Sequence, residues 1–191
     1  MRKIALEDIM GLAAYEKARE ELRKKIIELK HRRRVSVGDK VTLVFENRDT
    51  VAFQIQEMVR AEKITDLDKI REEIETYNEL IPRPSELSAT LFLEIADQTH
   101  LRDDLLKFLG IDEAVFLRVG DHSIRARFEE GRSKEDKISA VQYVKFPFTE
   151  ETLGAFIRGE PAELVIDHPN YKAKKVFEPA TQQSLTEDLR N

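Results

Sequence analysis

The sequence predicts a single α+β domain in which N-terminal helices pack on a largely antiparallel sheet. Three observations lead to this prediction. Helical periodicity dominates the first part of the chain, short β-rich runs joined by turns dominate the last third, and an alternating strand–helix–strand order is weak. A doubly wound sheet is the second choice. We expect residues 1–178 to form the domain and residues 179–191 to be a polar C-terminal tail that frays.

A long helix comes first, because apolar side chains recur there on one stripe among Glu and Lys: Leu12, Tyr15, Leu22, Ile26 and Leu29. It ends in the basic run Lys30–Arg34, where cations complement the helix dipole. A solvated helix end is the favoured interpretation of this run, and a patch that binds anions or nucleic acid is the alternative. Residues 35–37 and 41–45 follow as strands around the turn at Gly38-Asp39.

The segment "FENRDTVAFQIQEMVRAE", residues 45–62, is ambiguous, because it fits either the second strand of a hairpin or an amphipathic helix. Arg-Asp is not the type of turn that tight hairpins prefer, and "QEMVRAEK" is a strong helix former. The prediction is therefore a helix over residues 49–63 with Asp49 as its N-cap. It joins the next helix, capped by Asp66 and ending before Pro82, in a helical hairpin.

The remaining elements follow from their boundary signals. Residues 86–95 are predicted as a strand, and residues 99–110 as a helix capped by Thr99 and ended by Gly110. Residues 114–119 and 123–128 flank a turn at residues 120–122, and residues 140–148 form another strand. A short helix capped by Thr149 precedes a last hairpin, formed by residues 162–167 and 171–177 around residues 168–170.

Composition excludes several classes of function. The chain has no cysteine, so thiolate clusters, thiol catalysis and disulfides are excluded. The net charge of −5 argues against a nucleic-acid partner, and no apolar run is long enough for a membrane helix. Without a signal peptide, a cytoplasmic location is expected. Glycine-rich phosphate loops and a G-x-S-x-G elbow are absent, which argues against the common nucleotide-binding and hydrolase folds. No catalytic residue and no cofactor are predicted.

One candidate metal site comes from two turns. His122 and His168 follow Asp121 and Asp167, and imidazole and carboxylate groups are ordinary ligands of divalent metals. If the two turns approached each other, these side chains would form one site. Asp, Asn and His are also common in turns, and an ordinary turn composition is the favoured interpretation.

A candidate binding face comes from the helix at residues 49–63, which carries apolar residues on two sides. The simpler interpretation is a scaffold helix buried on both sides. The functional interpretation is a face that binds a protein partner or a ligand, made of Phe53, Gln54, Gln56, Glu57 and Arg60. A further alternative is a homodimer with the long first helix as its interface.

Four stretches, "VTLVFENRDTVAFQIQEMVRAEKI", "ETYNELIP", "ELSATLFLEI" and "SAVQYVKFPF", resemble the bacterial domain-of-unknown-function family 3501 in order and over nearly the whole chain. The resemblance implies no activity, cofactor or catalytic residue. Members of that family are often encoded beside rubrerythrin-like and iron–sulfur oxidoreductase proteins, which implies a role near peroxide or redox stress. The combined expectation is an accessory protein that acts through a protein partner; the alternative is a metal- or small-molecule-dependent enzyme that uses the turn His and Asp residues.

Overall fold

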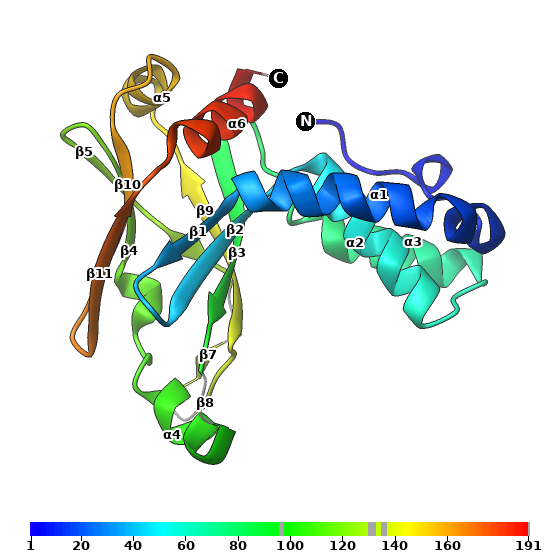
Figure 1. The fold of residues 1–191 in the computed structure, drawn as a ribbon, viewed down its shortest axis with the longest axis horizontal. Coiled ribbons are helices and arrows are strands. Elements are labelled where there is room, and N and C mark those ends of the chain that lie inside the picture. Colours follow the sequence, from blue (N-terminus) through cyan, green and yellow to red (C-terminus); the bar gives the residue numbers. More distant parts are fainter. Residues whose placement is uncertain (96–97, 130–132, 135–136, 191) are drawn as a thin grey trace.

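The computed structural model describes residues 1–95, 98–129, 133–134 and 137–190 (Figure 1). It confirms the α+β class: helices flank antiparallel sheets in one domain. Three N-terminal helices extend to one side of the sheets, whereas the remaining helices cover the two ends of the sheets (Figure 1). The fold therefore places a helical layer beside the sheets, and this layer contains the predicted binding face.

The strands are distributed over two main sheets and not over one. The first sheet has the order β1-β2-β3-β9-β6 and the second has the order β11-β10-β4-β5, and every pairing in them is antiparallel. The first comprises β1 (Arg34–Val37), β2 (Val41–Glu46), β3 (Glu86–Leu93), β9 (Val141–Pro147) and β6 (Arg127–Phe128). The second comprises β11 (Tyr171–Val176), β10 (Ala162–His168), β4 (Val115–Val119) and β5 (His122–Arg125). A small ribbon pairs β7 (Ser133–Lys134) with β8 (Lys137–Ile138).

The main hydrophobic core lies between the two sheets. Alternate residues of each strand point into it because side chains alternate across a strand, as Leu43 and Phe45 on β2 and Leu117 on β4 show. Helix α5 (Glu150–Ile157) and helix α6 (Pro179–Arg190) close one end of this core with Phe156 and Leu185. The predicted cap of α5 is confirmed, since the hydroxyl of Thr149 accepts a hydrogen bond from Thr152 N.

Helices α1 (Leu12–Arg32), α2 (Arg48–Ala61) and α3 (Leu67–Asn78) form a helical lobe with residues 1–11. The lobe has its own apolar cluster, in which Ile4 of the N-terminal segment packs with Val51, Ile55 and Ile74. These helices contact one another more than they contact the sheets. The lobe meets the rest of the chain where α2 lies against β2 and where α1 lies against α6. The predicted helical hairpin of α2 and α3 is confirmed, with Asp66 as the N-cap of α3.

The ambiguous segment forms a helix, α2, but its predicted cap was wrong. Asn47, not Asp49, is the N-cap: its side-chain oxygen accepts hydrogen bonds from Asp49 N and Thr50 N. The physical reason is that Asn47 has an extended backbone directly after β2. Its carboxamide oxygen therefore lies beside the backbone N–H groups of the first turn, which have no partner within the helix. Asp49 lies inside that first turn.

The connection from β3 to β9 differs from the prediction in two places. The helix predicted over residues 99–110 is shorter: a 3₁₀ turn, Gln98–His100, leads into α4 (Leu101–Leu106), so His100 and not Thr99 precedes the α-helix. The strand predicted over residues 123–128 divides at Ala126, because β5 pairs with β4 in the second sheet and β6 pairs with β9 in the first. The chain thus crosses between the sheets at this point.

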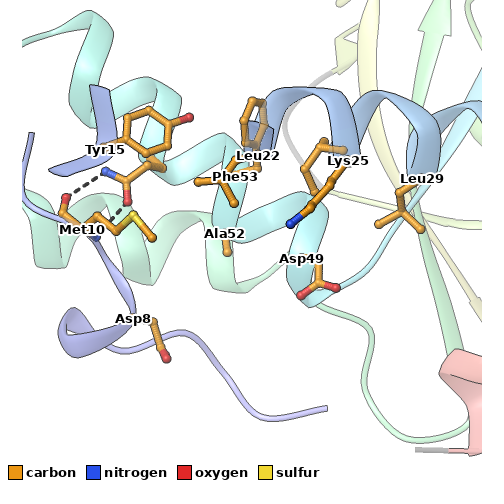
Figure 2. Close-up of a pocket in the computed structure, with 11 residues that line it drawn as sticks. Asp8, Met10, Tyr15, Leu22, Lys25, Leu29, Asp49, Ala52 and Phe53 are labelled. Atoms are coloured by element: carbon orange, nitrogen blue, oxygen red, sulfur yellow. Dashed lines mark hydrogen bonds between the residues drawn. The ribbon is translucent and has the colours of Figure 1, made fainter. Parts of the chain in front are cut away.

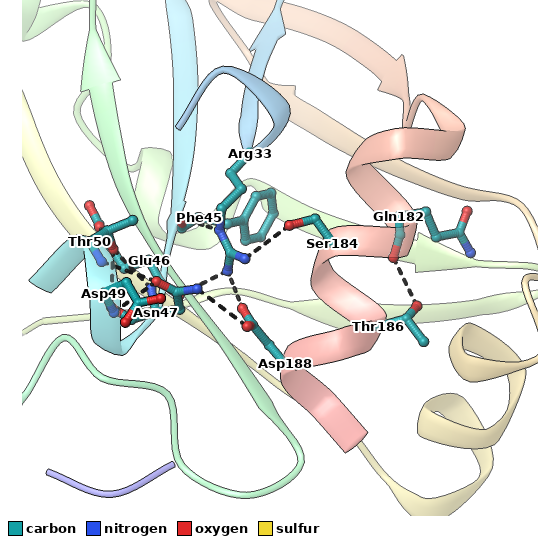
Figure 3. Close-up of polar contacts among 10 residues, drawn as sticks. All are labelled: Arg33, Phe45, Glu46, Asn47, Asp49, Thr50, Gln182, Ser184, Thr186 and Asp188. Atoms are coloured by element: carbon teal, nitrogen blue, oxygen red, sulfur yellow. Dashed lines mark hydrogen bonds and ion pairs between the residues drawn. The ribbon is translucent and has the colours of Figure 1, made fainter. Parts of the chain in front are cut away.

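The C-terminal residues do not fray as expected. Residues 179–190 form α6, which buries Leu185 in the main core. The guanidinium of Arg33, 1% exposed, donates to Ser184 Oγ and to the Asp188 carboxylate, and it also donates to the carbonyl oxygen of Phe45 (Figure 3). Two of the polar side chains of this segment, Ser184 and Asp188, serve the buried network around Arg33. Within the described ranges, no helix combines the length and apolar character that crossing a bilayer requires.

Candidate functional site

The predicted binding face on α2 is largely covered by the chain itself. Glu57 accepts hydrogen bonds from Arg19 Nε at 2.7 Å and Arg19 Nη2 at 2.8 Å, and from Tyr15 Oη at 2.7 Å. The Arg19 hydrogen bond is the main cause that lowers the pKa of Glu57 to about 2, and burial raises the pKa of Tyr15. This cluster joins the N-terminal half of α1 to α2, so the Glu57 carboxylate serves a contact within the chain.

Two further predicted residues are also engaged within the chain. Arg60 Nε donates to Glu16 Oε1 of α1 at 2.7 Å. Gln56, which is buried, makes a two-point contact with the backbone of Met10: its Nε2 donates to Met10 O at 2.9 Å, and its Oε1 accepts from Met10 N at 2.8 Å. The carboxamide therefore bonds to both backbone groups of Met10, as a paired β-strand would, and holds the N-terminal segment against α2.

Gln54 and Phe53 lie apart from that contact. Gln54 hydrogen-bonds with Tyr77 of α3, and burial raises the pKa of Tyr77. Phe53 is half-buried and faces the cavity that opens between α1 and α2. The five predicted residues thus do not form one surface, and Phe53 marks the part of the face that the chain leaves open.

That opening, which we call the α1–α2 groove, has a volume of about 300 Å³. Figure 2 shows it bounded by α1, α2 and the N-terminal segment, with Leu22, Leu29 and Phe53 among its walls. Its full lining is Asp8, Met10, Tyr15, Leu22, Lys25, Ile26, Leu29, Asp49, Ala52, Phe53 and Gln56. Met10, at one end, is 42% exposed. The groove is thus mainly apolar, with charged groups only at Asp8, Lys25 and Asp49.

The groove lining has its charged side chains around an apolar strip, and it holds no serine, threonine, cysteine or histidine. A catalytic nucleophile would need a neighbouring base within hydrogen-bond reach. Among the residues that the structure describes, no group of three or more His, Asp or Glu side chains is placed to hold a metal ion.

The structure does not bring the two predicted metal turns together. On β4, Val119 pairs with His122 of β5 and with Ala162 of β10, whereas His168 lies six residues further along β10. At about 3.3 Å per residue, the two histidines lie roughly 20 Å apart. His168 is buried and bonded to Leu109 O at 2.8 Å, and Asp167 pairs with Lys172 at 2.6 Å. His122 lies 3.8 Å from Glu151. These groups therefore serve separate turns.

Sequence reasoning missed the residues on α1 that complete the groove. The stripe of Leu22, Ile26 and Leu29 was visible as helical periodicity, and it predicted a buried face. In the structure all three are only half-buried, because α2 opposes them with Ala52 and with Phe53, which only partly cover them. A periodic pattern identifies an apolar face but not how much of it a neighbour covers.

Comparison with known proteins places the chain among proteins of unknown function. A family model described as "Protein of unknown function (DUF3501)" matches residues 3–189. The crystal structure of a novel protein of unknown function from Burkholderia pseudomallei K96243 has a TM-score of 0.92 and 34% sequence identity; the match covers 98% of this chain and 100% of that one. No curated protein matches. The similarity extends over the helical lobe and both sheets.

Proposed function

The chain belongs to the DUF3501 family, and from this premise we propose that it is a non-catalytic accessory protein whose α1–α2 groove binds an amphipathic helix of a partner protein. One observation carries the proposal. The apolar stripe of Leu22, Ile26 and Leu29 on α1 is only half-buried, and it lines an open cavity across from Phe53. Grooves of this kind receive the apolar face of a helix, whose side chains enter at helical spacing.

The basic end of α1 favours a partner helix that carries acidic residues at the matching end. Between residues 23 and 32, α1 carries the cations Arg23, Lys24, Lys25, Lys30 and Arg32 and one carboxylate, Glu28. The groove lining itself is mixed in charge: Lys25, which pairs with Glu21, lies there together with Asp8 and Asp49. A helix whose apolar face enters the groove would place its flank beside these cations, and opposite charges at the rim of an interface accelerate association and set its orientation.

A role beside redox proteins is part of this proposal. The resemblance of the sequence suggests rubrerythrin-like and iron–sulfur oxidoreductase proteins as neighbours, so they are the first candidate partners. The absence of cysteine supports an accessory role beside them, because the chain cannot supply thiolate ligands or a reactive thiol.

The proposal is tested with substitutions that change the groove and leave the core intact. Leu22→Gln and Ile26→Gln each place a polar group in the groove, at positions that are only half-buried. Ile27→Gln is the matched control, because Ile27 is 51% exposed on the same helix and does not line the groove. Each protein is checked by circular dichroism and titrated against purified candidate partners by calorimetry.

We expect the wild type and Ile27→Gln to bind a candidate partner with equal affinity. Each groove variant should bind at least about tenfold more weakly, which corresponds to the loss of one well-packed apolar anchor at an interface. Equal binding by Ile26→Gln, Leu22→Gln and the wild type would contradict a role for the groove. Absence of binding to every candidate would contradict the redox association.

A further inference from the structure

The N-terminal segment, residues 1–11, is held on α2 and α3 in the way that a bound peptide is held. Two buried carboxamides each bond both backbone groups of one residue of the segment. Asn78 of α3 bonds Ile4 N and O at 2.8 and 2.9 Å, and Gln56 of α2 bonds Met10 N and O at the same two distances. Bonds to the backbone hold an extended segment equally well whichever copy of the chain supplies it.

The segment also closes the apolar cluster of the helical lobe. Ile4 is 3% exposed and packs with Val51 and Ile55, and Leu6 and Ile9 pack on the same cluster while remaining partly exposed. Without the segment this apolar surface would face water, which costs free energy in proportion to its area. The lobe therefore requires an occupant with an aliphatic side chain at the position of Ile4.

Two residues of the segment belong to the α1–α2 groove as well. Asp8 and Met10 are part of the groove lining, and both lie at the same end of it (Figure 2). Asp8 is fixed there by Arg48 at the beginning of α2, whose Nη2 lies 2.7 Å from Asp8 Oδ2. The groove is thus incomplete unless a segment of this sequence is docked beside it.

The chain reverses direction between the segment and α1. The segment runs toward the far end of the lobe, and α1 returns from there toward the sheets (Figure 1). Gly11 lies at this corner in extended backbone, with φ of −59° and ψ of 147°, and a Cβ built on it would meet no atom within 4 Å. Rotation at Gly11 would release the segment, and the seven residues from Gly11 to Ile4 could reach up to about 25 Å.

Met10 gives this corner an apolar surface. Its side chain is 42% exposed, although it is large and apolar. In a pair of chains that exchange their segments, the two corners lie side by side at the two-fold axis, where the flexible Met10 side chains can pack on each other. The other contacts of the segment are the same in the single chain and in the pair, so this additional contact favours the pair.

We propose that two copies of the chain exchange residues 1–10, with Gly11 as the hinge, so that the segment of each copy docks on α2 and α3 of the other. Exchange of an identical element is a low-cost route to a dimer, because each contact that opening breaks is formed again in the pair. Each α1–α2 groove then takes Asp8 and Met10 from the second copy. The importance of that consequence rests on the proposed function of the groove, whereas the exchange itself does not.

The test uses the absence of cysteine in the chain, which allows single thiols to be placed. Lys3 in the segment and Glu79 at the end of α3 are both exposed, and Lys3 Nζ lies 3.3 Å from Glu79 Oε1. Lys3→Cys protein and isotope-labelled Glu79→Cys protein are refolded together from urea, so that slow opening of the segment does not limit exchange. A short bifunctional maleimide is then added at increasing protein concentration, and mass spectrometry identifies products that contain one chain of each kind.

Two controls define the background and the maximum of this reaction. Lys17→Cys replaces Lys3→Cys in the matched control, because Lys17 is exposed on α1, which stays with its own copy. A chain with both Lys3→Cys and Glu79→Cys is the positive control, since its thiols meet whether the segment docks within one chain or on a second copy.

The hinge is tested by a short glycine insertion between Met10 and Gly11 in the Lys3→Cys and Glu79→Cys proteins. A longer connection relaxes the corner and favours docking within one chain, because short hinges promote exchange. The same insertion between Gly120 and Asp121, in the turn between β4 and β5, is the matched control.

We expect the Lys3→Cys and Glu79→Cys mixture to give a mixed product that increases with protein concentration, and the Lys17→Cys mixture to stay at background. The insertion at the hinge should remove most of the mixed product, and the insertion at Gly120 should leave it unchanged. The proposal is overturned if the first mixture gives no more mixed product than the Lys17→Cys control. A dimer in light scattering without mixed product would also overturn it, because the interface would then lie elsewhere. Partner titrations with the groove variants do not depend on this result, so the two proposals can fail separately.

Discussion

Arg19 and Glu57 form a two-point ion pair that joins α1 to α2, with Nε and Nη2 at 2.7 and 2.8 Å from the two carboxylate oxygens. The pair shows how a polar residue of α2 is bonded within the chain. Glu57, Gln56 and Arg60 each hold a part of the chain that precedes the sheets. The open part of the surface is apolar and lies beside them.

The Arg19–Glu57 pair predicts a pH-dependent contribution to stability. The folded state lowers the pKa of Glu57 from 4.5 to about 2, so the contribution is fully present above pH 4.5 and is lost as the pH falls toward 2. Glu57→Gln should lower the free energy of unfolding by about 2 kcal/mol at neutral pH, with much less loss near pH 2. Urea denaturation across this range measures the difference, and a constant difference at every pH would contradict the assignment.

The buried pair of Arg33 and Asp188 predicts that α6 is integral to the fold. Asp188→Ala should cost about 3–5 kcal/mol, because it leaves the buried guanidinium of Arg33 without its carboxylate. Gln183→Ala, at an exposed position of the same helix, should change stability by less than about 0.5 kcal/mol. Equal effects in chemical denaturation would show that α6 is held by its apolar contacts alone.

Asn78 is predicted to hold the N-terminal segment. Its Nδ2 donates to Ile4 O at 2.9 Å and its Oδ1 accepts from Ile4 N at 2.8 Å. Asn78→Leu leaves both buried backbone groups of Ile4 unsatisfied, at a cost of about 1–3 kcal/mol for each group. Hydrogen exchange of the Ile4 amide should accelerate strongly, whereas Thr76→Ala, on the exposed face of α3, should leave it unchanged. Unchanged exchange in Asn78→Leu would contradict this role.

Gly38 and Tyr171 are predicted to be energetically coupled. Tyr171 Oη donates to Val37 O at 2.7 Å and accepts from Lys40 N at 3.1 Å, which fixes the turn between β1 and β2. Gly38 has φ of +75°, and a Cβ there would lie 2.2 Å from Tyr171 Oη. Gly38→Ala should destabilise the protein by more than the about 1–2 kcal/mol that left-handed backbone alone costs.

A double-mutant cycle separates the backbone strain at Gly38→Ala from the steric clash of the new methyl group with Tyr171. In Tyr171→Phe the hydroxyl is gone, and the nearest ring atom would be 3.0 Å from the new methyl group of Gly38→Ala. The double variant should therefore be more stable than the sum of the single effects predicts, by at least about 1 kcal/mol. Strict additivity in thermal denaturation would show that backbone strain alone explains the effect of Gly38→Ala.

Lys63 is predicted to be a site of stabilisation. It ends α2 with φ of +53°, and Ile64 N bonds to Val59 O at 2.9 Å across it. Lys63→Gly should raise the free energy of unfolding by up to about 1 kcal/mol, because glycine adopts this conformation without strain. Glu62→Gly, one position earlier in right-handed backbone, should instead lower it by about 0.5–1 kcal/mol. The same sign for both substitutions would contradict the argument.

Much of the fold could be predicted because local signals determine it. Apolar periodicity predicted α1, the choice between helix and strand for α2 was correct, and the caps of α3 and α5 are the residues expected. The errors lie where distant groups decide the outcome. Asn47 and not Asp49 caps α2, because the end of β2 places the Asn47 side chain beside the first amides of the helix. Helix α6 is ordered because Ser184 bonds to Arg33 and Leu185 packs in the main core.

The candidate sites depended still more on tertiary structure. The sequence by itself determined the class of fold, the lack of thiol chemistry, the apolar stripe on α1 and the basic run at its end. Only the tertiary structure decided that Glu57 is bonded within the chain, that Leu22 and Ile26 are only half-buried, and that Lys175 lies near Arg34 beside α6. The reason is physical: periodicity and capping act within a few residues, whereas coverage of a face and convergence of charges depend on which distant elements pack together.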